Sequence, residues 1–236
     1  MKLLVYILFS SALFAQNAEE ILKESDRSRT FAAESKIELL VENYQDDKLD
    51  SSERMVVYNK GQKKSLVKLA DRNGQFVLMV DENMWIYFPL TRKPIRITAF
   101  QRLLGQASNG DIARLSYVDD YNATLLKEST FNDEACHILE LKAKSKSSTY
   151  RKIHYWISQK TQLPLKADYF MISGKHFKTA FFENYQTVKG RTLIGAMRFF
   201  KVDQPENVTI MKFLSFKEES LPDKYYNKNY LRNIKL

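Results

Sequence analysis

The sequence predicts a mainly β fold: one strongly curved antiparallel sheet of about a dozen strands, with an N-terminal helix and an inserted lid helix. Extended segments bounded by turn residues follow one another in quick succession, and no long helical segment separates them. Aromatic residues, which favour pleated and half-buried surfaces, reach 13%, with 15 Phe and 13 Tyr. Strands in such an order pair as hairpins, and a sheet this wide has to curl.

The composition fits a single globular domain. Hydrophobic residues make up 44% and charged residues 28% of the 236 residues, which excludes a disordered chain. The 7 Gly and 5 Pro are too few for a collagen-like or low-complexity sequence. All-β sandwiches and barrels of this length commonly form one domain, so we expect a single domain over residues 16–236.

The N-terminus has the order of a secretory signal. One positive charge at Lys2 precedes an almost wholly apolar stretch over residues 3–14, and Ala15 offers a small residue for cleavage. The apolar stretch is shorter than the roughly 20 residues that a membrane-spanning helix needs. We therefore predict a cleaved signal peptide over residues 1–15 and export of the remaining chain. The alternative is that this stretch forms a first strand or helix of the core.

The first half of the domain begins with a helix and continues with strands. Residues 17–29 have a helical pattern, because Asn17 and Glu20 match a capping box and small or apolar residues recur on one face. Asn73-Gly74 is the strongest hairpin signal among the extended segments that follow. The strands expected here are 33–44, 52–59, 64–70, 75–80, 84–88 and 93–98.

Residues 99–118 interrupt the strands. Phe100, Leu103 and Leu104 lie three and four positions apart, which predicts a short helix, and a polar stretch over residues 105–111 follows. Long connections inside a compact sheet protein usually serve a purpose, so we expect a lid or a mouth in this segment.

Strands resume after the interruption and end in a helical tail. The strands expected are 122–128, 135–143, 150–158, 163–171, 175–186, 192–201 and 208–217. The tail from Leu221 is expected to add one or two helical turns with tyrosines and Leu231 against the sheet, and Pro222 suits a first helical position.

The formal net charge of +9 is compatible with nucleic acid, anionic lipid or an acidic partner. The basic residues are spread over strands and turns, and export removes access to nucleic acid, so no nucleic-acid partner is expected. Cys136 is the single cysteine, so no internal disulfide can form. Its apolar, alternating surroundings predict a buried and unreactive thiol.

The sequence carries no motif of a known catalytic centre, so we expect no catalytic residues and no cofactor. Gly-x-Ser-x-Gly, P-loop and Gly-x-Gly-x-x-Gly patterns do not occur. The histidines are His137, His154 and His176, and Cys136 and His137 point to opposite faces of a strand, so no metal site is expected either.

Three segments stand out in the central part of the sequence: MWIYFP from Met84, RKPIRI from Arg92 and QRLLGQASNGDIAR from Gln101. The resemblance that they carry is to the outer-membrane lipoprotein-sorting, LolA-like family, in particular the branch associated with RND-type exporters. It continues through DYNATLL from Asp120, residues 152–158 and LPLK from Leu163, and it ends at Leu221-Pro222-Asp223. It covers nearly the whole chain after the predicted signal peptide.

The resemblance implies an incomplete β-barrel closed by helices, with an apolar cavity for acyl chains. It implies a periplasmic carrier that binds the acyl chains of a lipoprotein or a lipid and shuttles it towards the outer membrane. The partners expected are a lipid or an acylated lipoprotein and an inner-membrane exporter of the RND or ABC type. Contact with the membrane is expected to be transient, and the protein is expected to be a monomer.

Alternating strand positions are the candidates for lining the cavity, since every second side chain of a strand shares one face. The sequence leaves open which face is concave, and ordinary core is the alternative for each residue. The candidate lipid-binding residues on strands are Phe76, Leu78, Val80, Trp85, Tyr87, Ile95, Ile97, Tyr155, Ile157, Tyr169, Phe181 and Phe199.

The lid and the rim supply the remaining candidates. Phe100, Leu103 and Leu104 would form the apolar side of the lid, with a satellite core helix as the alternative. The Arg fork makes charge-assisted hydrogen bonds to phosphate or carbonyl groups, which gives the candidates for headgroup binding at the rim. These are Arg92, Arg96 and Arg102, each with a solvated surface charge as the alternative.

Two other functions remain open. The first is an enzyme on the same fold that holds a small apolar substrate in a closed pocket, with polar groups such as His154 or Tyr155 inside. The second is a periplasmic accessory subunit of an exporter that transports nothing itself, which predicts no open cavity. Fold analogy alone does not separate these functions.

Overall fold

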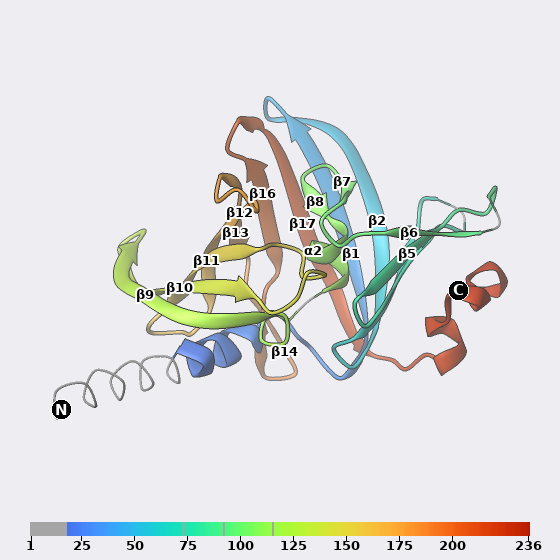
Figure 1. Cartoon of the computed structure of the whole chain (residues 1–236), viewed down its shortest axis with the longest axis horizontal. Coiled ribbons are helices and arrows are strands. Elements are labelled where there is room, and N and C mark those ends of the chain that lie inside the picture. The colour runs from blue at the N-terminus through green and yellow to red at the C-terminus, as the bar shows by residue number, and fades with distance from the viewer. Residues whose placement is uncertain (1–17, 73, 92, 115) are drawn as a thin grey trace.

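The computed structural model describes residues 18–72, 74–91, 93–114 and 116–236, except the side chain of Arg102 (Figure 1). The predicted signal peptide, the Asn17 cap and the candidate rim residue Arg92 lie outside these residues. Residues 18–26 are helical, and Ala18, Ile21, Leu22 and Ser25 are buried, which confirms the predicted helix and its apolar face.

Within the described residues, thirteen strands form one antiparallel sheet, which confirms the predicted fold class. The strands in the first half are β1 (Glu34–Gln45), β2 (Lys48–Lys60), β3 (Lys64–Leu69), β4 (Phe76–Val80), β5 (Asn83–Tyr87) and β6 (Pro94–Ile97). Those in the second half are β9 (Tyr121–Phe131), β10 (Glu134–Ala143), β11 (Lys152–Ser158), β12 (Pro164–Phe170), β13 (His176–Glu183), β16 (Ala196–Lys201) and β17 (Gln204–Glu218). A small hairpin, β14 (Gln186–Val188) and β15 (Arg191–Leu193), stands apart from the sheet.

The strand order is β6-β5-β4-β3-β2-β1-β17-β16-β13-β12-β11-β10-β9. Strands β1 and β17 pair in the middle and join the two halves of the sheet. Strands β6 and β9 are therefore the two edges, and the sheet curves without closing on itself (Figure 1). The chain between these edges has to run from one end of the curved sheet to the other.

The hairpin turns follow from local chemistry. Asp46 and Asp47, between β1 and β2, both have positive φ values of 47° and 60°, as do Asn132 and Asp133 between β9 and β10, at 48° and 63°. Two-residue turns of this hand match the twist of the flanking strands, and Asn and Asp tolerate them. The hairpin predicted around Asn73-Gly74 is present as the β3–β4 pair, joined by residues 70–75.

The sheet buries apolar side chains on both faces. The concave face carries the main core, in which Ile37, Leu39 and Val41 of β1 meet side chains from both ends of the sheet. The opposite face of β2–β5 carries a second cluster, covered by the C-terminal tail. The members of this outer cluster are Tyr58, Leu66, Phe76, Leu78, Tyr87, Leu221, Tyr226 and Leu231.

The C-terminal tail forms two short 3-10 helices, η1 (Asp223–Tyr226) and η2 (Lys228–Asn233). Tyr226 and Leu231 are buried against the sheet, which confirms the predicted packing of the tail. Pro222 occupies the cap position before η1, so its predicted place as the first helical residue is off by one.

The helix predicted at Phe100, Leu103 and Leu104 is wrong. This stretch forms a hairpin of β7 (Arg102–Leu104) and β8 (Ala107–Ser108), and the helix α2 (Asn109–Ala113) begins only after it. Gly105 has a φ of +50° and sits so close to the sheet that a Cβ would lie 1.7 Å from the Asn43 Oδ1. The spacing of the apolar residues mimicked a helix, but the turn at glycine and the contact with the sheet decide the local structure.

We predict that Gly105→Ala lowers the free energy of unfolding by about 2–4 kcal/mol, because it adds backbone strain and overpacking together. The matched control is Gly190→Ala: Gly190 also has positive φ, at +75°, but has nothing within 4 Å of its virtual Cβ. Backbone strain alone should cost the control about 1–2 kcal/mol. Urea denaturation of both variants measures the difference, and equal losses would contradict the close contact at Gly105.

Candidate functional site

The described residues of the stretch 99–118, which are 99–114 and 116–118, lie on the concave face of the sheet (Figure 1) and are hereafter called the covering segment. They connect the edge strand β6 to the edge strand β9 and contain β7, β8 and α2, which lie inside the curved wall in Figure 1. Ala99, Ala107, Ile112, Ala113 and Tyr117 belong to the main core. Three groups of polar contacts attach the segment, each to a different element.

The first attachment holds the β7–β8 hairpin on β1 and β17. The Gln106 backbone N–H donates to the Thr209 Oγ1 at 2.8 Å, and the Thr209 hydroxyl donates to the Asn43 Oδ1 at 2.7 Å. Gly105 leaves the space that this close approach needs. The hairpin is therefore fixed to the middle of the sheet by polar contacts.

The second attachment holds α2 on β13 and on the chain just before β11, and it contains a buried ion pair. The Lys178 Nζ lies 2.6 Å from the Asp111 Oδ2, and the two side chains are only 3% and 2% exposed. The Tyr150 hydroxyl hydrogen-bonds to both Asp111 carboxylate oxygens at 2.9 and 2.8 Å, to the Ser108 hydroxyl at 2.9 Å and to the Lys178 ammonium. A Cβ at Gly110 would lie 1.9 Å from the Thr149 Oγ1, so α2 rests directly on the chain entering β11.

Asp111 has a double role because it also begins α2. Its carboxylate accepts the Ser108 backbone N–H at 2.9 Å and the Ser108 hydroxyl at 2.7 Å, in the manner of a capping box. Burial lowers the pKa of Lys178, and the carboxylate of Asp111 opposes this shift. The ammonium also lies 4.7, 4.9 and 5.0 Å from the ring centroids of Tyr150, Tyr169 and Phe199, which is cation–π distance.

The third attachment holds the end of the covering segment on the N-terminal helix. The Asp26 Oδ2 accepts the Tyr117 backbone N–H at 2.6 Å, the Val118 backbone N–H at 2.8 Å and the Ser116 hydroxyl at 2.9 Å. The Arg29 Nε lies 3.7 Å from the Asp26 Oδ1, and its guanidinium lies 4.0 Å from the centre of the Tyr117 ring. Burial raises the pKa of Asp26, while Arg29 and the three hydrogen bonds oppose the shift.

Between these attachments the hollow of the sheet is filled by tyrosines. The ring centroids of Tyr150 and Tyr169 are 4.2 Å apart, those of Tyr117 and Tyr155 are 5.3 Å apart, and those of Tyr117 and Tyr121 are 5.4 Å apart. The hydroxyls of Tyr117 and Tyr169 share a hydrogen bond of 3.1 Å. A void of about 10 Å³ lies beside Asp111 and Tyr150, which is room for about one water molecule. In the part of the chain that the structure describes, these side chains therefore occupy the place of the wide apolar cavity expected from the sequence.

The concave face holds only part of the predicted lipid-binding set. Five of these residues belong to the main core or pack against it: Ile97, Tyr155, Ile157, Tyr169 and Phe199. None of the five lines one of the surface pockets. Leu103 and Leu104 also pack partly buried against this core. These side chains are in position to meet a ligand only if the covering segment moves.

The prediction that the other strand residues line the same hollow is wrong. Phe76, Leu78 and Tyr87 belong to the outer cluster beneath the C-terminal tail, and Val80 and Trp85 pack partly buried against it. Phe181 stacks on Phe131 and Phe200, while its neighbours Ala180 and Phe182 point into the main core, so it too faces outwards. The period of two was predicted correctly, but both faces of β4 and β5 are apolar, and the sequence pattern therefore could not identify the concave one.

The remaining candidates lie near the ends of the covering segment. Phe100 is 48% exposed and Ile95, on the edge strand β6, is 47% exposed. Arg96 is exposed and its Nη2 donates to the Asn83 Oδ1 at 2.6 Å. Arg102 contributes backbone to β7. Of the three predicted rim arginines, only the side chain of Arg96 is among the described residues, so a shared rim site stays a prediction.

An apolar pocket of about 520 Å³ opens at the edge of the covering segment, beside Phe100. Its volume falls within the range of about 300–1,000 Å³ that is usual for small-molecule sites. The residues lining this rim pocket are Thr98, Phe100, Lys146, Ser148, Thr149, Tyr150, Arg151, Phe170, Met171, Ile172 and Ser173. Tyr150 forms the inner wall of the pocket, and its hydroxyl hydrogen-bonds to Lys178 of the Lys178–Asp111 ion pair. One side chain therefore separates the pocket from the ion pair.

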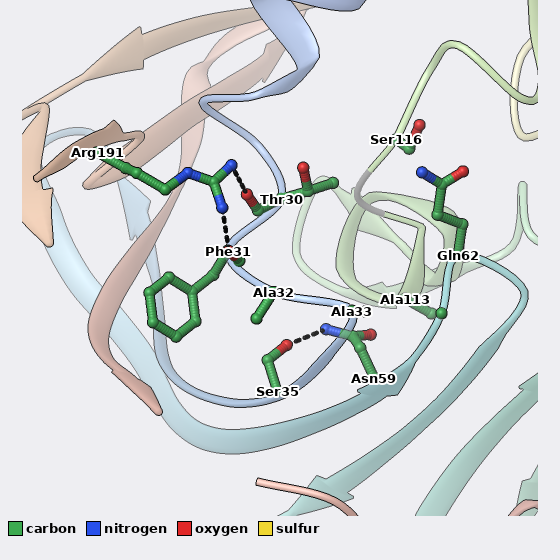
Figure 2. A pocket seen from close by; sticks show the side chains of 11 residues that line it. Thr30, Phe31, Ala32, Ala33, Ser35, Asn59, Gln62, Ala113, Ser116 and Arg191 are labelled. Carbon is green, nitrogen blue, oxygen red and sulfur yellow. Dashed lines mark hydrogen bonds between the residues drawn. The ribbon is translucent and has the colours of Figure 1, made fainter. Parts of the chain in front are cut away.

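A second pocket, of about 260 Å³, lies where the N-terminal helix leads into β1 (Figure 2). Arg191 crosses it and donates to the backbone carbonyls of Thr30 at 2.9 Å, Arg27 at 3.2 Å and Phe31. Asn59 and Ser35 hydrogen-bond to each other on its floor at 3.5 Å. These polar groups are occupied with holding the chain after the helix, so the rim pocket is the better candidate for an apolar ligand.

Sequence reasoning missed the polar side chains that attach the covering segment: Asp26, Arg29, Asp111, Tyr150 and Lys178. Two signals were available. Ser108 and Asp111 have the spacing of a capping box, which marks the true start of α2. Lys178 shares the face of Ala180 and Phe182 under the period of two, which places a lysine inside the core. A lysine there requires a buried acidic partner.

The histidine and cysteine side chains are dispersed. His154 faces Glu140 at 3.5 Å and burial lowers its pKa, while His176 lies 3.3 Å from Asp168. Cys136 is buried, which confirms the predicted burial of the thiol, and burial raises its pKa. No group of three or more His, Cys, Asp or Glu in the part of the chain that the structure describes is arranged to hold a metal ion. No helix there is both long and apolar enough to cross a membrane.

An open curved sheet with a segment attached across its concave face defines the class of incomplete-barrel proteins. A LolA superfamily protein from Nitrosomonas europaea is 30% identical to this chain, over 90% of this chain and 98% of that one, with a TM-score of 0.84. A family model described as an uncharacterized protein matches residues 61–233. The chain belongs to the LolA superfamily.

Two further solved structures share the fold. A DUF1329 family protein from Desulfovibrio piger is 24% identical over 92% of this chain and 99% of that one, with a TM-score of 0.77. An outer membrane lipoprotein-sorting protein domain from Vibrio parahaemolyticus is 19% identical over 92% and 99%, with a TM-score of 0.75. A search of curated proteins finds no match.

We predict that the buried tyrosines ionise only when the protein unfolds. Burial raises the pKa of Tyr117, Tyr121, Tyr150, Tyr155 and Tyr169 above the ordinary value of 10.0. Because the folded pKa values are the higher ones, the stability that these groups contribute is complete below pH 10.0 and is lost as the pH rises above it. Alkaline titration followed by tyrosinate absorbance and circular dichroism should show these five signals rising with unfolding, whereas full ionisation in a native spectrum would contradict the packing.

Proposed function

We propose that the protein is a periplasmic carrier that shelters acyl chains under the covering segment and moves them towards the outer membrane. The observation that carries this proposal is the attachment of the segment by buried polar contacts, with an apolar pocket open at its edge. The conformation described above is then the closed, unloaded state. Opening of the segment would expose the aromatic floor of the sheet to the ligand.

The energetics of the attachments support a segment that opens. A buried ion pair contributes little net stability, because the desolvation of both charges offsets their attraction. It nevertheless fixes the relative position of its two side chains. Lys178 and Asp111 therefore hold α2 in one position while adding little net free energy to the closed state. An acyl chain entering the space would gain about 25 cal/mol for each Å² of apolar surface removed from water. Such a gain can compensate for the hydrogen bonds and the ion pair that break when the segment opens.

Membership of the LolA superfamily supports the cargo and partners that we propose. The related Vibrio protein is described as sorting lipoproteins, which supports a lipid or an acylated lipoprotein as the cargo here. The predicted signal peptide supports a periplasmic location. An inner-membrane exporter of the RND or ABC type would deliver the cargo, and a monomer would carry it.

A second candidate is a periplasmic accessory subunit of an exporter that carries no lipid. One observation favours it: the hollow is filled by the tyrosines and leaves a void of only about 10 Å³ beside Asp111. This candidate predicts co-purification with an exporter in fixed stoichiometry. An enzyme is less well supported, because the same void leaves no room for a substrate beside the Lys178–Asp111 pair.

We predict that Asp111→Asn accelerates uptake of a fluorescent fatty acid. Leaving Lys178 buried without its charge partner destabilises the closed state by about 3–5 kcal/mol, so the uptake rate should rise about tenfold or more. The matched control is Glu218→Gln, whose ion pair with Lys189 is equally short at 2.7 Å but is 59% and 64% exposed. The control should take up the fatty acid at the wild-type rate.

Lipid extracted from the purified wild-type protein completes this test. Mass spectrometry should find co-purifying acyl lipid. If no lipid co-purifies and neither the wild type nor either variant takes up the fatty acid, the carrier function is rejected. The accessory-subunit function would then be the better supported one.

A further inference from the structure

We propose that the β12–β13 turn and the rim pocket form a membrane-docking edge that places the pocket mouth on a bilayer containing anionic lipid. This inference rests on the proposed function for its purpose, but the docking itself is independent of cargo. The docking edge consists of Phe100, Met171 and Ile172 as its apolar part and Lys146, Arg151, Lys152 and Lys175 as its basic part.

The apolar part is unusually exposed. Ile172 is 84% exposed and Met171 is 41% exposed, at the tip of a hairpin turn closed by the Gly174 N–H to Met171 carbonyl hydrogen bond of 3.0 Å. Both residues line the rim pocket together with Phe100, which is 48% exposed. Large apolar side chains gathered on one projecting edge are typical of surfaces that contact a membrane or a partner.

The charges on the edge itself are all basic, and acidic side chains lie only at its border, where the Glu140 Oε2 is 3.9 Å from the Lys152 Nζ and the Asp168 Oδ1 is 3.3 Å from the His176 Nε2. The pocket lining includes Lys146 and Arg151 but no Asp or Glu. The two chain segments that build the edge, residues 141–153 and 169–182, contain no acidic residue. Lys175 is exposed beside the turn, and the Lys152 Nζ lies 4.4 Å from the centre of the Phe170 ring. Apolar side chains surrounded by cations match the chemistry of an anionic bilayer, in which acyl chains lie beneath phosphate groups.

The geometry favours a bilayer over an acidic protein. Met171 and Ile172 project from a turn, so they can enter the boundary between headgroups and acyl chains without any change in the sheet. The rim pocket opens beside them and is bounded on its inner side by Tyr150, which contacts the Lys178–Asp111 pair. An acyl chain leaving the bilayer would therefore reach the covering segment without crossing water.

The test is vesicle sedimentation with the full-length protein after removal of its signal peptide. Vesicles of phosphatidylglycerol and phosphatidylethanolamine should bind the protein, and vesicles of phosphatidylcholine should bind it at least about tenfold less, since several cations each contribute. Met171→Ser combined with Ile172→Ser should lower binding to the anionic vesicles about tenfold or more. Lys146→Gln combined with Lys175→Gln should also lower binding and flatten its dependence on salt.

The matched control is Leu90→Ser, because Leu90 is 98% exposed at a different turn, between β5 and β6. It should bind vesicles like the wild type. The inference is overturned if the Met171/Ile172 variant binds as well as the wild type, or if the wild type does not bind anionic vesicles. The second result would indicate that the docking edge binds a protein instead of a membrane.

A second measurement separates this inference from the proposed function. Uptake of a monomeric fluorescent fatty acid from solution should be unchanged in a Lys175→Gln variant, because Lys175 belongs to the docking edge but does not line the rim pocket, while transfer of the same fatty acid from anionic vesicles should slow. If the wild type binds vesicles but takes up no fatty acid, the proposed carrier function is rejected and the membrane-docking inference still stands.

Discussion

The structure depends on one topological constraint: the sheet is wide enough to curve but does not close. Its edge strands, β6 and β9, are consecutive elements of the main sheet along the chain, so the connection between them has to span the open side. The covering segment makes this connection across the concave face. The curvature of the sheet, the burial of the tyrosines and the presence of a covering segment all follow from the failure of these two edges to pair.

The chain fixes this segment chiefly with polar contacts placed on different supports. Asn43 and Thr209 stand in the middle of the sheet, Lys178 and Tyr150 on its second half, and Asp26 on the N-terminal helix. Desolvation offsets much of the energy of such polar contacts, yet they tolerate few alternative geometries. These polar contacts therefore define one closed position for the segment, in addition to the apolar contacts that Ile112 and Tyr117 make in the main core.

The sequence predicted the sheet well and the cover poorly. The strands are set by local turn chemistry and by the period of two, and both are visible in one sequence, as at Asp46-Asp47 and in β1. The cover depends on contacts between residues far apart, such as Lys178 with Asp111 and Gly105 with Asn43, which no local pattern encodes. The same limit explains why Phe76 and Leu78 were assigned to the hollow: the C-terminal tail that covers the outer face is distant in sequence.

The central claim is that the covering segment must leave the sheet before an acyl chain can enter. A Cβ at Gly110 would lie 2.8 Å from the Thr149 Cβ, so a small shift to the disulfide separation of about 3.8 Å permits a cross-link between Gly110→Cys and Thr149→Cys in a Cys136→Ser background. Uptake of a fluorescent fatty acid should be absent in the oxidised protein and restored by reduction. Equal uptake by the oxidised and reduced forms would contradict the account.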